Sequence, residues 1–211
     1  KLDSLSSMGK ISGYRAVIEA CNAYEGFFGP QITAAGKYPP CKMLIIGGGV
    51  AGLEAIGAAK CLGADVRCFD TRSVCREQVE SMGGTFLDLR VPSKENGEGA
   101  GGYAKTKEHV EAMQTGSVIV DLAARTGGNC ALTQPGKVIV HKGVTIIGYR
   151  QLPCRMARIA SEMYANNLFR LLEHMHGAKE FTVDASDDII RNMLVCNERQ
   201  VTYPPKTFLQ P

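Results

Sequence analysis

The stretch KMLIIGGGVAGLEAIGAAKCLGADVRCFD, residues 42–70, decides the fold of this chain. It begins with a short apolar run, 42–47, of the kind that forms a buried parallel strand. Apolar residues at helical spacing follow, and Gly63 ends that helix before a second strand over 64–70. The order strand, helix, strand predicts a βαβ unit, and therefore an α/β fold with a Rossmann-type doubly wound parallel sheet.

Glycines fill the junction between the first strand and the helix. The sequence GGGVAG, residues 47–52, fits the pattern GxGxxG. Gly47 allows the tight turn, Gly49 lets the backbone approach a pyrophosphate, and Gly52 lets helix and strand pack closely. The helix N-terminus then faces the anion. The pattern predicts a dinucleotide site, but it names no reaction because FAD-binding proteins share it.

An acidic residue lies where such a site needs one. Asp70 ends the second strand, and its carboxylate can accept hydrogen bonds from both ribose hydroxyls of adenosine while repelling a 2′-phosphate. Asp70 therefore favours NAD over NADP. Arg72 lies two residues later and favours the opposite choice, because a nearby arginine is one way to hold a 2′-phosphate.

Composition excludes several classes of protein. The 211 residues include 24 Lys+Arg and 21 Asp+Glu, a net charge of +3, and the basic residues are scattered, so we expect no nucleic-acid partner. The longest apolar runs are far shorter than the roughly 20 residues of a membrane helix, so we expect no span. Eight cysteines without a CxxC pair favour a reducing compartment, and we expect no metal site.

Outside the βαβ unit, apolar spacing and turn residues predict a series of further elements. They are a helix over 11–25, a loop closed by Pro39 and Pro40, a helix over 73–82, a strand over 85–89, a glycine-rich loop over 93–102, a helix over 105–113, a strand over 117–123, a hairpin from 137–141 and 144–149, a helix over 155–176, and a tail with edge strands over 180–211. Gly127-Gly128-Asn129 follows the strand over 117–123, where ligand crevices of parallel sheets form. A plain turn is the alternative there.

These segments together resemble the NAD(H)-binding domain, domain I, of the proton-translocating NAD(P) transhydrogenases. Alanine dehydrogenase shares the fold and the glycine motif, but FDTR, GGYAK and GGNC resemble the transhydrogenase version. The resemblance runs along nearly the whole chain and is carried by ITAAGKYPP (32–40), the stretch 47–72, EQVESMGG (77–84), GGYAK (101–105), GSVIVDLAARTGGNC (116–130) and VTIIGY (144–149).

The resemblance implies a component of a larger enzyme. Domain I would hold NADH, a partner domain would hold NADP(H), and hydride would pass between the two nicotinamides while a separate membrane domain moves protons. The family also implies a homodimer, with 137–149 as an interface element. The chain would lie on the soluble face of a membrane enzyme: the matrix side of the mitochondrial inner membrane in a eukaryote, or the cytoplasmic face of the inner membrane in a bacterium.

The resemblance also assigns candidate site residues. Gly102 and Tyr103 would belong to a mobile loop that closes on nucleotide, although Tyr103 could instead be a hydrophobic anchor. Asp3 and Ser6 would lie near the nicotinamide, as the catalytic positioning residues. The cofactor-binding candidates are Gly47, Gly49, Val50, Ala51 and Gly52 at the pyrophosphate, Asp70, Thr71 and Arg72 at the ribose, and Gly102, Tyr103, Ala123 and Asn129 elsewhere in the crevice.

This chain departs from the family pattern in two places. The family's nicotinamide loop has an arginine and a glutamine upstream of the position of Asp3, which would precede Lys1 here, and the second departure lies after Lys105. We expect residues 1–40 to be a connecting helix and loop from a missing N-terminal subdomain, 41–150 the NAD(H)-binding domain, and 151–211 a closing helix with a C-terminal extension. Roughly one βα unit is missing after Lys105, which would leave neighbouring strands with unpaired backbone groups. We interpret both departures as segments omitted from the sequence.

Two alternatives remain open at this point. A free-standing NAD-dependent oxidoreductase of the alanine dehydrogenase type would need a substrate pocket supplied by the missing subdomain. A truncated, non-catalytic NAD-binding fragment would follow if the departures are real in the polypeptide. We expect this chain alone to bind NAD(H) without completing catalysis.

Overall fold

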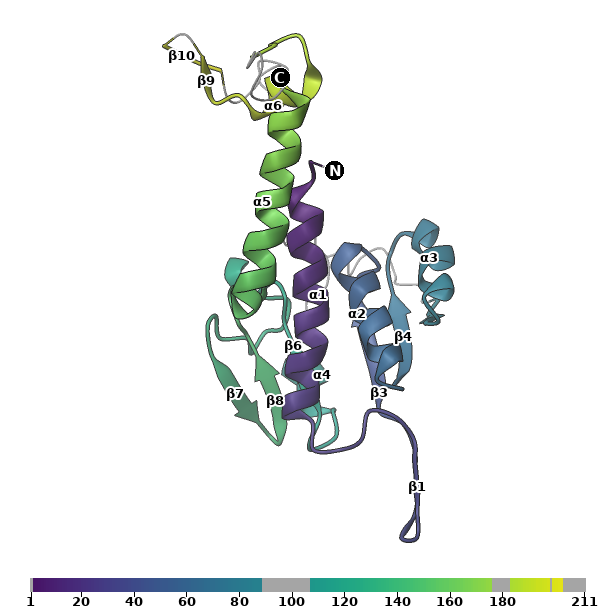
Figure 1. Cartoon of the computed structure of the whole chain (residues 1–211). Coiled ribbons are helices and arrows are strands. Elements are labelled where there is room, and N and C mark those ends of the chain that lie inside the picture. The colour runs from purple at the N-terminus through teal and green to yellow at the C-terminus, as the bar shows by residue number, and fades with distance from the viewer. Residues whose placement is uncertain (1, 89–106, 176–182, 198, 203–211) are drawn as a thin grey trace. The chain divides into compact units, whose positions relative to one another are not determined.

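The computed structural model describes residues 2–88, 107–175, 183–197 and 199–202 (Figure 1). The chain divides into two compact units. One unit runs from Ser4 to Glu162, and the other comprises Lys1–Asp3 and Met163–Pro211. All predicted site residues that the structure describes, except Asp3, belong to the first unit.

The predicted βαβ unit is confirmed. Three parallel strands lie in the order β3-β4-β5, and Ile46 at the end of β3 pairs with Phe69 at the end of β4. Their connections are helical, as a parallel sheet requires. The elements are β3 (Lys42–Ile46), α2 (Val50–Cys61), β4 (Asp65–Phe69), the 3-10 helix η1 (Ser73–Cys75), α3 (Arg76–Ser81) and β5 (Thr85–Phe86).

A second three-stranded sheet has the order β6-β8-β7, in which β6 is parallel to β8 and β7 is antiparallel to it. The predicted hairpin is confirmed, and Lys142 and Gly143 both have positive φ at its two-residue turn. The elements are α4 (Lys107–Glu111), β6 (Val118–Val120), the 3-10 helix η2 (Ala124–Thr126), β7 (Val138–His141) and β8 (Val144–Ile147).

Helix α1 (Ser4–Ala23) begins seven residues before the predicted helix over 11–25 and contacts both α2 and β6 (Figure 1). Its Val17 is buried in the core of the first sheet, together with Ile56 of α2 and Val66 of β4. Gly13 brings the two helices close, because a Cβ there would lie 2.0 Å from the carbonyl oxygen of Ala51. The helix therefore packs tightly against the start of α2.

A buried carboxylate ties α1 to the segment that follows the second sheet. Glu19 accepts a hydrogen bond from Arg15 Nε at 2.8 Å and another from Arg155 in the 3-10 helix η3 (Leu152–Met156). Arg155 also stacks over the ring of Tyr149, 4.2 Å from its centroid. Burial opposes ionisation of Glu19, but the two arginines outweigh it and lower its pKa.

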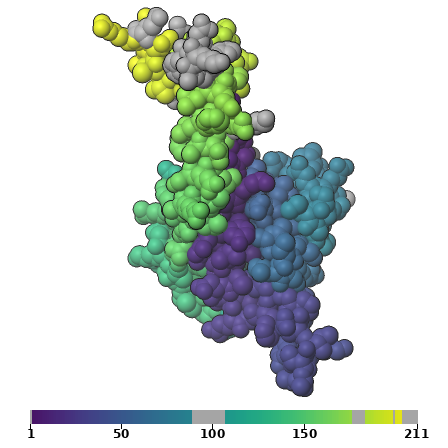
Figure 2. Space-filling model, in the orientation of Figure 1, coloured from purple at the N-terminus to yellow at the C-terminus, as the bar shows by residue number. Residues whose placement is uncertain are grey.

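The loop expected before Pro39 and Pro40 is in fact a short hairpin. Strands β1 (Gln31–Thr33) and β2 (Gly36–Tyr38) pair antiparallel, and all six of their residues are exposed. Figure 2 shows this hairpin standing out from the molecular surface. Alternation of apolar residues did not reveal it, because the hairpin has no buried face to impose that pattern.

The unit that includes residues 163–211 holds most of α5 (Ala157–His174), with α6 (Asp188–Met193), β9 (Cys196–Asn197) and β10 (Gln200–Val201). The sequence predicted edge strands in this tail but not α6, whose N-cap Asp187 accepts from the N–H groups of Ile189 and Ile190. Among the helices of the described residues, none is long and apolar enough to span a membrane.

Candidate functional site

The glycine turn after β3 has the geometry that the motif requires. Gly47 has φ +102°, a region that glycine adopts readily, and its N–H donates to the carbonyl of Phe69 at 2.8 Å. A Cβ at Gly52 would lie 1.8 Å from the carbonyl oxygen of Gly47, so α2 packs against the turn only with glycine there. The predicted turn and packing roles of Gly47 and Gly52 are confirmed.

Gly49 leaves open space at the N-terminus of α2. Its backbone is extended, with φ −80° and ψ −169°, so no conformational strain demands glycine there. The nearest atom to an added Cβ is Arg72 Nη2, at 3.9 Å. Gly49 provides no side-chain cap, and the first turn of α2 holds no acidic residue. No side chain caps the N-terminus of α2, and Gly49 has no side chain to block it. An anion such as pyrophosphate can therefore approach the N–H groups of the first helical turn.

Asp70 lies directly beside this turn, at the end of β4. Its Oδ2 accepts the N–H of Gly48 at 2.7 Å and Arg72 Nη2 at 3.1 Å. Its Oδ1 accepts the N–H of Arg72 at 2.8 Å and Arg72 Nε at 3.1 Å. These four donors account for the acceptor capacity of a carboxylate.

The environment of Asp70 keeps the carboxylate ionised. Its side chain is buried, and burial alone would raise the pKa. The hydrogen bonds from the side chain and N–H of Arg72, and from the N–H of Gly48, outweigh that effect and lower the pKa of Asp70 to about 2. Asp70 is therefore a fixed negative charge next to the glycine turn at neutral pH.

A second buried carboxylate organises the loop after β6. Asp121 Oδ2 accepts the N–H groups of Asn129 at 2.7 Å and Cys130 at 3.0 Å, and the hydroxyl of Thr133 at 2.6 Å. Its Oδ1 accepts the N–H of Ala123 at 3.0 Å. The loop that carries two of the predicted site residues is thus held by one side chain.

Comparison with known proteins places this arrangement in a family. The family model described as "Alanine dehydrogenase/PNT, C-terminal domain" matches residues 16–100 and 104–204. The chain belongs to the alanine dehydrogenase/transhydrogenase family. This confirms the resemblance inferred from the motifs.

Two curated relatives are the NAD(P) transhydrogenase alpha subunits of Cereibacter sphaeroides, 41% identical over 97% of this chain, and of Haemophilus influenzae, 43% identical over 96%. The chain spans about half the length of these relatives, 47% and 48%. A crystal structure of transhydrogenase from Sinorhizobium meliloti is 34% identical, with a TM-score of 0.77 over 90% of this chain and 60% of that chain.

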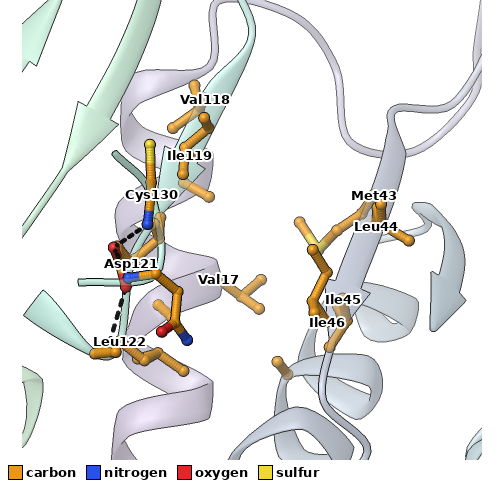
Figure 3. A pocket seen from close by; sticks show the side chains of 16 residues that line it. Val17, Met43, Leu44, Ile45, Ile46, Val118, Ile119, Asp121, Leu122 and Cys130 are labelled. Atoms are coloured by element: carbon orange, nitrogen blue, oxygen red, sulfur yellow. Dashed lines mark hydrogen bonds between the residues drawn. The ribbon is translucent and has the colours of Figure 1, made fainter. Parts of the chain in front are cut away.

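In the structure, most of the predicted site residues of this family member follow the carboxyl ends of the parallel strands β3, β4 and β6. Ala123 and Asn129 line a pocket that also contains Ile46, the last residue before the glycine turn (Figure 3). Thr71 is exposed between Asp70 and Arg72. The predicted loop residues Gly102 and Tyr103 lie outside the described residues.

The two residues predicted near the nicotinamide fall on or just before α1. Ser6 is half-buried and lies one helical turn before Gly9, whose added Cβ would lie 3.4 Å from Val50 at the start of α2. Residues three apart share a helix face, so Ser6 lies on the side of α1 that meets α2. Asp3 belongs to the other compact unit.

Sequence reasoning missed two residues of the site in this family member. It placed Asp121 only within the strand expected over 117–123, although a buried Asp before a glycine-rich loop is a typical acceptor for loop N–H groups. It also missed Gly13, which permits the close contact of α1 with the start of α2. A glycine inside a predicted amphipathic helix was the available signal.

Proposed function

We propose that this chain is the NAD(H)-binding part of a proton-translocating NAD(P) transhydrogenase. In this role it donates hydride from NADH to NADP+ held on a partner domain, and a separate membrane domain couples the transfer to proton movement. The observation that carries the proposal is the uncapped N-terminus of α2 behind Gly49, with the ionised carboxylate of Asp70 beside it. Family membership and the transhydrogenase relatives support it.

The residues present fit a dinucleotide. The N–H groups of Val50, Ala51 and Gly52, in the first turn of α2, would bind the pyrophosphate. Asp70 would accept the ribose hydroxyls of adenosine once the exposed side chain of Arg72 moves from its carboxylate. We assign Thr71 and Arg72 to the rim of the ribose site, and Gly102 and Tyr103 to its cover.

The contribution of the protein to hydride transfer is positioning. NADH itself supplies the hydride, so no side-chain acid is required. Ala123 and Asn129, held by Asp121, and Ser6 on α1 would orient the nicotinamide ring and exclude water, and Asp3 would assist them. Orientation of this kind lowers the barrier by removing freedom of motion before the reaction.

The assembly and location complete the proposal. NADP(H) would be held on the partner domain, and two copies of this chain would pair through the hairpin β7–β8. The chain would face the matrix at a mitochondrial inner membrane, or the cytoplasm at a bacterial inner membrane.

A nucleotide titration of the Gly49→Ala variant tests the proposal. Alanine fits the extended backbone and the open space at this position, so the urea midpoint should stay at the wild-type value. Its methyl group would occupy the path of the pyrophosphate, so NADH binding should weaken by about tenfold or more, or ~1.4 kcal/mol. Nicotinamide fluorescence measures the affinity, with NADPH as the weaker competitor.

The matched control is Gly57→Ala, farther along α2, where an added Cβ meets only the mobile tip of the Met82 side chain. This variant should bind NADH as the wild type does. Wild-type affinity in Gly49→Ala, or tighter binding of NADPH than of NADH by the unchanged chain, would contradict the proposal.

A further inference from the structure

Helix α1 lies against the first turn of α2, the turn whose N–H groups we propose to bind the pyrophosphate (Figure 1). The two backbones come very close at Gly13, where a Cβ would lie 2.0 Å from the carbonyl oxygen of Ala51 and 3.1 Å from its Cα. In glycine a hydrogen occupies that direction, so it points at this oxygen. The Cα of Gly13 then lies no more than about 3.5 Å from the oxygen, which is the distance of a Cα–H···O contact.

The carbonyl that Gly13 contacts belongs to the same peptide group as one of the proposed pyrophosphate donors. The C=O of Ala51 and the N–H of Gly52 lie in one planar trans peptide, so they point in opposite directions and cannot turn independently. The first N–H of α2 that donates within the helix is that of Leu53, to the carbonyl of Gly49 at 2.8 Å. The N–H of Gly52 precedes it and is one of the donors that a helix N-terminus offers to an anion. Whatever fixes the carbonyl of Ala51 therefore fixes the direction of the Gly52 N–H.

The glycine turn holds the other side of this peptide group. A Cβ at Gly52 would lie 1.8 Å from the carbonyl oxygen of Gly47 and 2.9 Å from its carbon, so the Cα of Gly52 lies directly against the turn. The peptide group between Ala51 and Gly52 is thus confined by two backbone contacts. The GxGxxG motif supplies one of them, and Gly13 of α1 supplies the other.

Contacts one turn before and one turn after Gly13 keep α1 in this position. Gly9 lies on the same face of the helix, and a Cβ there would lie 3.4 Å from Cγ1 of Val50. Val17 is buried in one core cluster with Ile56 of α2. The close approach at Gly13 is therefore part of a continuous contact between the two helices.

We propose that Gly13 is a positioning residue for nucleotide binding. Through the carbonyl of Ala51, it holds the peptide group in the orientation in which the Gly52 N–H donates to the pyrophosphate. A donor that is fixed before the ligand arrives loses little conformational freedom on binding, which raises the affinity. The inference rests on the proposed function, because it takes the pyrophosphate to lie at the start of α2.

Calorimetric titration of Gly13→Ala with ADP-ribose and with adenosine tests this role. Both ligands carry the ribose that Asp70 would bind, but only ADP-ribose has the pyrophosphate. The added methyl group must displace α1 or the carbonyl of Ala51, so the affinity for ADP-ribose should fall about tenfold, as for the loss of one hydrogen bond to a charged group. The affinity for adenosine should stay within about twofold of the wild-type value, because that ligand does not use the Gly52 N–H.

Val66→Ala is the matched control for lost stability. Val66 is buried in the same core as Val17, and it pairs with Met43 near the amino ends of the strands, away from Asp70. The truncation should destabilise the protein as Gly13→Ala does. At a temperature well below unfolding, it should nevertheless bind both ligands with wild-type affinity. Urea titration establishes that both variants are folded under the conditions of the binding measurement.

A measurement on the unchanged chain decides the question if Gly13→Ala does not fold. In NMR titrations, ADP-ribose should shift the amide proton of Gly52 and the Cα protons of Gly13 over the same range of ligand concentration, because one peptide group joins them. Adenosine should shift neither signal.

Three results would overturn the inference and leave the proposed function intact. They are wild-type affinity of folded Gly13→Ala for ADP-ribose, an equal loss of affinity for adenosine, and a Gly13 signal that stays in place while the Gly52 amide shifts. Failure of the unchanged chain to bind ADP-ribose would instead contradict the proposed function, and this inference with it.

Discussion

The guanidinium of Arg72 holds both oxygens of the Asp70 carboxylate, with Nε 3.1 Å from Oδ1 and Nη2 3.1 Å from Oδ2. The arginine side chain is 61% exposed, whereas that of the aspartate is 4% exposed. The aspartate is therefore the buried, fixed partner of the pair, and the arginine is the partner that a ligand can reach from solvent. In this pair, Arg72 occupies the acceptor positions that we propose for the ribose.

Removing Arg72 should favour the bound nucleotide. In Arg72→Ala, both carboxylate oxygens of Asp70 lose a competing donor, so NADH affinity should rise by about two- to fivefold, a gain of ~1 kcal/mol or less. Titration by nicotinamide fluorescence measures the change. If NADH binding instead falls tenfold, Arg72 contacts the nucleotide directly.

The charge of Asp70 should make stability depend on pH in the acid range. Its folded pKa, about 2, lies below the ordinary value of 3.8, so its contribution is fully present above pH 4 and is lost as the pH falls toward 2. The shift corresponds to about 2 kcal/mol. Thermal unfolding of wild type and Asp70→Asn between pH 2 and pH 7 should show curves that diverge as the pH rises. Parallel curves would show that Asp70 does not contribute in this way.

Loss of Asp121 should disorder the loop after β6. Asp121→Ala leaves the N–H groups of Ala123, Asn129 and Cys130 without this acceptor, so we expect a cost of about 2–4 kcal/mol in the free energy of unfolding. Urea titration measures it. Thr133→Val is the control, since it removes only one of the four hydrogen bonds and should cost about 1 kcal/mol. Equal losses in the two variants would contradict the central role of Asp121.

Two glycines of α1 should respond oppositely to the same substitution. A Cβ at Gly13 would lie 2.0 Å from the carbonyl oxygen of Ala51, so Gly13→Ala should destabilise the protein by about 1–3 kcal/mol. At Gly9 the nearest atom, Val50 Cγ1, is 3.4 Å from an added Cβ, and alanine should stabilise the helix by about 0.5–1 kcal/mol. Thermal melts of both variants check the difference. Stabilisation by both would show that α1 and α2 separate easily.

Local patterns predicted much of the fold correctly. The βαβ unit and the hairpin β7–β8 follow from runs of consecutive residues, because the periodicity of apolar side chains and the glycines at turns act over a few positions. The hairpin β1–β2 and helix α6 were not predicted. Both are short and mostly exposed, so burial imposes little pattern on their sequences.

In the candidate site, too, some features follow from the local sequence and others only from the tertiary structure. By itself, the sequence determined the turn at Gly47, the close packing at Gly52 and the position of Asp70 at a strand end, since each depends on a motif or a strand boundary. Only the tertiary structure decided that Asp121 holds the loop of Asn129, that Gly13 meets Ala51, and that β3 and β6 line one pocket. The reason is physical: these relationships join atoms whose separation in space depends on how whole elements pack, which no local pattern records.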